Sequence, residues 1–211
     1  MSLDPAEEEQ IQVLKSWWKN YGTSIVTGVI LGTAILGGYK YWHYQKLINS
    51  DKASLLYAQV LTDFRQNRRL DIKTNGDILI KDYPSTPYSQ MAALLLAKME
   101  YEAGNKTDAE KRLQWAVDNG VDTGLQHTAR LRLGRLLLEK KELDKALDLI
   151  IDDAPGFEPV YQELKGDILA EKGKVDEARA AYQLAIQKLD QGSGLKAMLE
   201  MKLANLGTEV L

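Results

Sequence analysis

Few residues of this chain have the type and spacing that catalysis requires. Cysteine is absent, which excludes a disulfide, a thiolate metal site and a cysteine nucleophile. The two histidines, His43 and His127, stand far apart, one in an aromatic stretch and one at the predicted start of a helix. We interpret both as ordinary polar residues rather than as a base or a metal ligand. The paired acids Asp152 and Asp153 lie in a predicted loop, where we expect them to be solvated.

Motifs for cofactor or nucleic-acid chemistry are also missing. No phosphate-binding glycine loop, zinc-ligand spacing or nucleophile motif occurs, so we expect no metal and no cofactor. The net charge of −3, from 27 basic and 30 acidic residues, gives no reason to expect nucleic-acid binding. The composition thus favours a non-enzymatic binding protein.

The residues that recur at regular spacing are suited to helix packing. In three segments a small residue is followed twelve positions later by alanine: Ala97 and Ala109, Gly134 and Ala146, Gly166 and Ala178. Gly134 lies 37 residues after Ala97, and Gly166 lies 32 residues after Gly134. These offsets bracket the period of about 34 residues that is typical of tetratricopeptide repeats.

A physical reason accounts for this spacing. Two antiparallel helices of a hairpin touch most closely where each presents a small side chain, so the first needs Gly or Ala near its middle and the second needs Ala near its start. Turns such as Ala103-Gly104-Asn105 reverse the chain between them. We therefore predict an all-α fold with a tetratricopeptide-like α-solenoid. The alternative is a generic helical bundle in which alanines recur by chance.

The repeat register also predicts a protein-binding groove. In tetratricopeptide arrays the first helix of each pair lines a concave surface. With Ala97, Gly134 and Gly166 taken as equivalent, the predicted groove residues are Leu94, Lys98, Tyr101, Leu131, Arg135, Leu138 and Asp167. This surface is mixed and grades from basic to acidic. The alternative is a groove that is filled by the protein's own flanking helices.

Near the amino terminus an uncharged segment has the length of a membrane span. The twenty residues from Asn20 to Tyr39 carry no charge and would form about 30 Å of helix, the thickness of a bilayer core. Aromatic residues flank the segment on both sides, as is typical of membrane interfaces: Trp17, Trp18, Tyr21, Tyr39, Tyr41, Trp42 and Tyr44. We predict one transmembrane helix over residues 21–42, and the lipid bilayer as a partner.

A cleaved signal peptide is the rival interpretation of this segment. The leader is acidic at Asp4 and Glu7, and the segment exits into the bulky Lys40-Tyr41-Trp42, where cleavage requires small residues. We therefore predict an uncleaved anchor. Gly28 and Gly32 form a G-x-x-x-G that would let a second helix pack closely, although glycines that merely face lipid would look the same.

Flanking regions complete the predicted organisation. Residues 1–20 form an interfacial segment, residues 21–42 the anchor and residues 43–211 the repeat domain. Residues 50–83 are a degenerate hairpin that caps the array, and a closing helix runs from about Leu195 to Leu206. Basic residues on the two sides of the span do not decide its orientation.

Together these features resemble a bacterial family, the YfgM-like ancillary subunits of the SecYEG translocon. The resemblance extends over nearly the whole chain, and its carriers are Gly28-Val29-Ile30-Leu31-Gly32 with Tyr41-Trp42, Ala53-Ser54-Leu55-Leu56-Tyr57, Leu131-Arg132-Leu133-Gly134-Arg135, Leu164-Lys165-Gly166, Lys172-Gly173, Ala178-Arg179, and Met201-Lys202-Leu203-Ala204-Asn205-Leu206. The chief departure is Gly134, where alanine is expected.

The resemblance implies more than the residues alone. It implies a single-pass protein of the bacterial inner membrane with a cytoplasmic amino terminus and a periplasmic repeat domain. The implied partners are SecYEG and a PpiD-type membrane-anchored periplasmic chaperone, which the protein would scaffold while it assists newly translocated proteins. The residues themselves leave open a cytosol-facing membrane-anchored tetratricopeptide adaptor that binds peptide tails or a soluble regulator.

Overall fold

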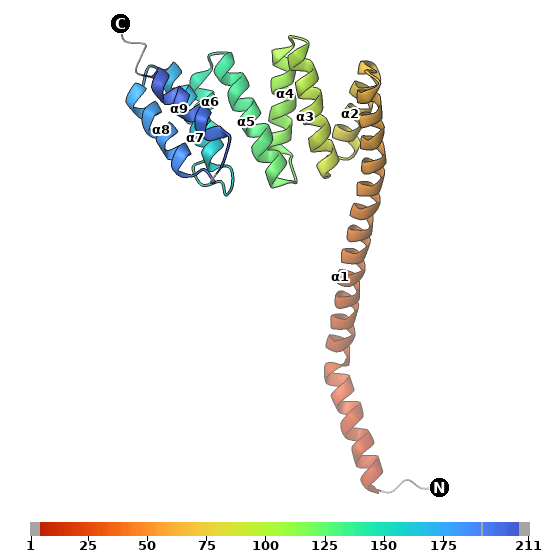
Figure 1. Ribbon diagram of the computed structural model, residues 1–211. Coiled ribbons are helices and arrows are strands. Elements are labelled where there is room, and N and C mark those ends of the chain that lie inside the picture. The colour runs from red at the N-terminus through yellow and green to blue at the C-terminus, as the bar shows by residue number, and fades with distance from the viewer. Residues whose placement is uncertain (1–4, 191, 207–211) are drawn as a thin grey trace. The chain divides into compact units, whose positions relative to one another are not determined.

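A computed structural model describes residues 5–190 and 192–206, and these are helical apart from short connections (Figure 1). The helices are α1 (Pro5–Arg65), α2 (Arg69–Asp82), α3 (Pro87–Glu102), α4 (Lys106–Asp118), α5 (Thr123–Glu139), α6 (Leu143–Asp148), α7 (Glu158–Glu171), α8 (Val175–Gln187) and α9 (Leu195–Asn205). Within these residues there is no β-strand, so the predicted all-α fold class is confirmed.

Contacts divide the chain into two units, Met1–Asp51 and Lys52–Leu211. The first contains the uncharged segment, and α1 is the one helix of the described residues that is long and apolar enough to cross a membrane. Almost none of that apolar window is buried, as the large exposed fractions of Leu31 and Ile35 illustrate. A core helix of a soluble protein would instead be covered by neighbouring side chains.

The second unit is an array of helical hairpins in which each element contacts its neighbours in sequence. Helices α3 and α4, α5 and α6, and α7 and α8 form the three hairpins that the small-residue spacing predicts. Buried apolar clusters follow one another from the end of α1 to α9, so the core continues along the array. This continuity is expected of a solenoid, because a single hairpin cannot bury its apolar face alone.

The starts of two helices, α3 and α5, have side-chain caps. The side chain of Thr86 accepts a hydrogen bond from the Ser89 backbone N–H, and Pro87 occupies the first position of α3. The Asp122 side chain caps α5 in the same way by accepting from the Leu125 N–H at 2.8 Å. These side chains satisfy donors that a helix start leaves unpaired, which is why the helices begin where they do.

Four turns of the array share one backbone geometry. Asn67, Gly104, Lys141 and Gly173 each have positive φ and each follow the last turn of a helix. In every case the next N–H donates to the carbonyl five residues earlier, as from Asn105 to Glu100 at 2.8 Å and from Glu142 to Leu137 at 2.9 Å. This pattern is the Schellman ending of a helix. The end of α1 with α2 is therefore a fourth hairpin, in the place where the sequence predicts a degenerate one.

The small residues of the repeats are buried, but one of them acts differently from the prediction. Ala109, Ala146 and Ala178 are fully buried at the starts of the second helices. A Cβ on Gly166 would lie 2.3 Å from Tyr182 of the partner helix α8, as the hairpin argument requires. A Cβ on Gly134 would instead lie 2.7 Å from Leu164 of the next repeat. Helix α6 is short, so at this position the close approach lies between repeats rather than within a hairpin.

Candidate functional site

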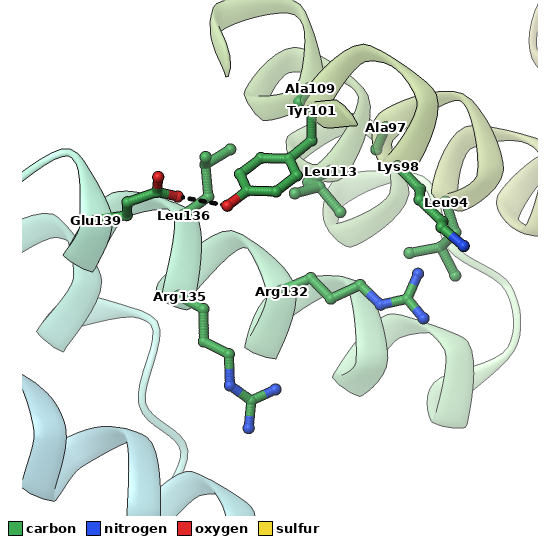
Figure 2. A pocket seen from close by; sticks show the side chains of 10 residues that line it. All are labelled: Leu94, Ala97, Lys98, Tyr101, Ala109, Leu113, Arg132, Arg135, Leu136 and Glu139. Carbon is green, nitrogen blue, oxygen red and sulfur yellow. Dashed lines mark hydrogen bonds between the residues drawn. The ribbon is translucent and has the colours of Figure 1, made fainter. Parts of the chain in front are cut away.

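Two adjoining cavities lie along the first helices of the repeats. The first, of about 310 Å³, is formed by α3, α4 and α5 and is called here the α3–α5 pocket (Figure 2). The second, of about 510 Å³, is formed by α5, α7, α8 and α9 and is called the α5–α9 pocket. Arg135 and Glu139 line both, so the two cavities are continuous along one groove.

An apolar floor underlies the α3–α5 pocket. Its members are the buried residues Leu94, Ala97, Ala109, Leu113 and Leu136. Alanines at the hairpin contact hold α3 and α4 close, and the larger leucines reach across to α5. The packing that stabilises the repeat thereby also forms the base of the cavity.

One wall of the same pocket is a fixed tyrosine. The Tyr101 hydroxyl donates to the Glu139 carboxylate at 2.9 Å, and Lys106 donates to the other oxygen of Glu139 at 2.7 Å. The hydrogen bond to the carboxylate raises the pKa of Tyr101. Lys106 and Tyr101 together lower the pKa of Glu139, so this acid stays ionised. The bond crosses from α3 to α5 and orients the aromatic ring along the pocket (Figure 2).

Three cations line the rim away from Tyr101: Lys98, Arg132 and Arg135 (Figure 2). Arg135 donates to the buried Glu163 at 3.2 Å, and Lys98 lies 3.7 Å from the exposed Glu102. Within the described residues Arg132 has no acidic partner. The pocket therefore combines an apolar base with a rim of excess positive charge.

The α5–α9 pocket has balanced charges. Lys202 of the closing helix donates to Glu163 at 2.8 Å and to both oxygens of Asp167 at 2.7 Å. The Tyr182 hydroxyl donates to Asp167 at 2.7 Å. Burial alone lowers the pKa of Lys202, but the two acids overcome this effect and raise it. Lys202 therefore stays protonated and joins α9 to α7.

The predicted groove residues fall into three groups. Leu94, Lys98, Tyr101 and Arg135 line the α3–α5 pocket, and Leu138 and Asp167 line the α5–α9 pocket together with Arg135. Leu131 lines neither cavity and is buried in the apolar core instead. On α5, Arg135 and Leu138 line the cavities as the predicted register expects, whereas Arg132 takes the place expected of Leu131.

Several groove residues were missed by the sequence reasoning. Arg132 lies next to the predicted Leu131. A count of apolar periodicity along α5 would have placed Leu131 in the core and Arg132 on the exposed face of the helix. Lys202 and Tyr182 come from other helices, and no local sequence signal links them to Asp167. The closing helix thus forms part of the lining at this end of the groove, through Lys202, Asn205 and Leu206.

The remaining polar candidates have structural partners. His127 Nδ1 lies 3.0 Å from the Tyr161 hydroxyl, and its ring stacks on Phe157. Asp152 accepts from Lys165 and Gln162. In the anchor, a Cβ on Gly28 or Gly32 would meet nothing within 4 Å, so the residues that the structure describes supply no packing partner for this pair. Across the described residues, no group of three acids or histidines is placed to hold a metal ion.

Comparisons with known proteins agree with this architecture. The tetratricopeptide repeat-like domain family matches residues 15–208. The chain is 30% identical to an ancillary SecYEG translocon subunit of Neisseria gonorrhoeae, over 98% of this chain and the whole of that protein. It is 27% identical to the protein of that name from Escherichia coli, over 98% of this chain and 99% of the relative. The Haemophilus influenzae protein is 30% identical, over 98% of this chain and its own full length.

Proposed function

The chain belongs to the tetratricopeptide repeat-like family that includes the ancillary SecYEG translocon subunits, and from this premise we propose that it is a non-enzymatic accessory subunit of the bacterial Sec translocon. The observation that carries the proposal is the similarity over the full length of those subunits, which includes both the anchor and the array. A shared module alone would match only the repeats.

The site supports a binding role. An open groove with an apolar base and charged rims suits a protein segment. Interface anchors are often Tyr and Arg, and Tyr101 and Arg135 both line the groove. We assign to this groove the capture of a partner at the membrane.

Our proposal extends to topology and partner. The amino terminus is cytoplasmic, the anchor crosses the inner membrane once, and the repeat domain is periplasmic. There the domain scaffolds a PpiD-type membrane-anchored chaperone beside SecYEG and assists newly translocated proteins. The anchor contributes by confining the protein to the membrane plane, which raises its effective concentration near a membrane-bound partner.

Two experiments test this function. A reporter that is active only in the periplasm, fused after Leu211, should give a signal, whereas activity of a cytosol-specific reporter would favour the cytosol-facing adaptor. Extraction in mild detergent followed by native electrophoresis and mass spectrometry should recover SecYEG and the chaperone with the protein. Recovery of neither partner from membranes that contain both would contradict the proposal.

For the groove itself, full-length protein is compared with the Tyr101→Ala, Arg135→Ala double variant. Both side chains are about half exposed, so the circular dichroism spectrum and the melting curve should change little. Capture of the chaperone should weaken by tenfold or more, since truncation of an interface anchor commonly costs about 2 kcal/mol. Undiminished capture would assign recognition to the membrane helix instead.

A further inference from the structure

The α3–α5 pocket has a charge that its own residues do not neutralise. Arg132 has no acidic partner within the described residues, and Lys98 has only a distant, exposed one. The one acid that lines the pocket, Glu139, is already bound by Lys106 and Tyr101. Elsewhere on the array cations lie close to acids, as Arg112 does at 2.6 Å from Asp77 and Lys141 at 2.6 Å from Glu171. The rim of the pocket therefore carries positive charge that is not balanced by neighbouring acids.

This charge surrounds a recessed apolar base. Leu94, Leu113 and Leu136 form the base, and Tyr101 forms a wall that its hydrogen bond holds in place. A cavity of about 310 Å³ above them is at the lower end of the range for ligand pockets, about 300 Å³ and upward. An apolar side chain can enter it while an attached carboxylate meets the guanidinium of Arg132.

The rest of the groove limits what can bind. In the α5–α9 pocket the charges pair with one another: Lys202 binds Glu163 and Asp167, and Arg135 also binds Glu163. A basic segment would be repelled by Arg132 and Lys98 in the α3–α5 pocket. In the α5–α9 pocket it would meet Glu163 and Asp167, which already bind cations of the chain. The apolar base formed by Leu94, Leu113 and Leu136 is recessed and almost buried, so a flat anionic surface such as a membrane could not contact it.

We propose that the α3–α5 pocket binds an acidic–apolar segment of a partner protein, with an apolar side chain over Leu94, Leu113 and Leu136 and a neighbouring carboxylate on Arg132 and Lys98. This inference rests on the proposed function, because it specifies the class of segment that the groove takes. Arg132 is its specificity-determining residue: it selects the charge of the segment without a role in the fold.

The test uses full-length protein in zwitterionic lipid nanodiscs and fluorescence anisotropy. The probe is a labelled, carboxyl-amidated peptide with the central sequence Asp-Leu-Phe-Glu between Gly-Ser flanks. A second peptide carries Lys in place of both acids, and a third carries Ala in place of Leu and Phe. The first should bind, and the other two should bind at least about tenfold more weakly, the ratio that corresponds to about 1.4 kcal/mol.

Matched variants test the residue assignment. Arg132→Gln should weaken the acidic peptide about tenfold and reduce its preference over the lysine peptide. Lys188→Gln removes the same charge from an exposed position at the end of α8, outside both pockets, and should change nothing. Unchanged melting temperatures verify that both variants are folded. Equal binding of the acidic and lysine peptides, or equal affinity of the two variants, would overturn the assignment.

Two further results separate this inference from its alternatives. Binding of phosphatidylglycerol vesicles that depends on Arg132, together with failure to bind the peptide, would assign the rim to a lipid surface and overturn the proposal. If SecYEG co-purifies while no peptide binds at millimolar concentration, the inference fails and the proposed function stands. If the peptide binds as expected and no translocon co-purifies, the proposed function fails and the pocket assignment stands.

Discussion

At the scale of single residues, the array uses one turn geometry with different side chains. Gly104 and Gly173 adopt positive φ without steric cost, whereas Lys141 holds a φ of 62° at the equivalent place. An L-residue with a Cβ in this conformation costs roughly 1–2 kcal/mol. The Lys141–Glu171 ion pair is exposed on both sides and offsets little of this cost.

Lys141→Gly should therefore stabilise the array by about 1 kcal/mol, because glycine removes the backbone penalty. Chemical denaturation of the full-length protein in detergent measures the change. Lys141→Ala is the matched control: it removes the same ion pair but keeps the Cβ, so it should give no stabilisation. Equal stability of the two variants would show that the turn is not strained.

Asp63 is a second residue whose environment has a measurable consequence. It is almost completely buried near the end of α1, and burial alone raises the pKa of its carboxyl. Hydrogen bonds from Gln59 at 2.8 Å, from Arg68 and from Asn75 at 2.9 Å outweigh burial and lower the pKa. While it is ionised, Asp63 thus stabilises the hairpin formed by the end of α1 and α2.

The pH dependence of this stabilisation has a definite sign. A lowered pKa in the folded protein stabilises it above the unfolded-state value of about 3.9, and the contribution is lost as pH falls through the folded-state value. Asp63→Asn should be clearly less stable than the wild type at pH 7, and the gap should narrow between about pH 4 and pH 2. Urea unfolding across this range tests the trend, with the exposed Asp153→Asn as control. A gap that stays constant with pH would contradict it.

At the scale of elements, the distance between helices depends on what faces each glycine. Gly166 faces the ring of Tyr182, which is 3% exposed and tied to Asp167 by its hydroxyl. Gly134 faces the terminal methyl of Leu164, the far end of a side chain that can change rotamer. The two positions are equivalent in the repeat but differ in how far their neighbours can move.

Gly166→Ala should consequently destabilise the array by about 2 kcal/mol or more, because the added methyl overpacks a fixed ring. Gly134→Ala should change stability by less than about 1 kcal/mol, since the helix preference of alanine offsets the shift of Leu164. Thermal unfolding of both variants measures the two losses of stability. A larger loss for Gly134→Ala than for Gly166→Ala would show that the two contacts are ranked in the wrong order.

At the scale of the whole molecule, the anchor and the array follow different solvation rules. Leu31 and Ile35 are largely exposed in the chain itself, and in lipid such exposure is favourable. In the array, apolar side chains are instead buried in a core that continues along the repeats, and the apolar base of the groove is recessed.

Leu31→Lys should prevent stable membrane retention, because lysine at the centre of a span costs about 2.5–3.5 kcal/mol on insertion scales. The fraction of the variant that is recovered with membranes after alkaline extraction measures this retention. Leu55→Lys, at a 73% exposed position of α1 beyond the uncharged segment, is the control and should be retained. Full retention of Leu31→Lys would argue against a transmembrane anchor.

Features that depend on local order along the chain could be predicted before the fold was known. The uncharged run from Asn20 to Tyr39 and the spacing of Ala97 and Ala109 report on helix length and on contact between consecutive helices. Both are short-range properties, so composition and period predict them. The class of fold, the hairpins and the closing helix follow from such properties.

Packing of the repeats against one another determines which side chains share the groove. A shift of one residue rotates a helix face by about 100°, so Leu131 is buried while the adjacent Arg132 lines the pocket, and what meets each face depends on how α5 packs against α3 and α7. The pairing of Lys202 with Asp167 joins positions 35 residues apart across separate helices. Such contacts depend on how the repeats stack, and stacking is a property of the packed array rather than of any one segment.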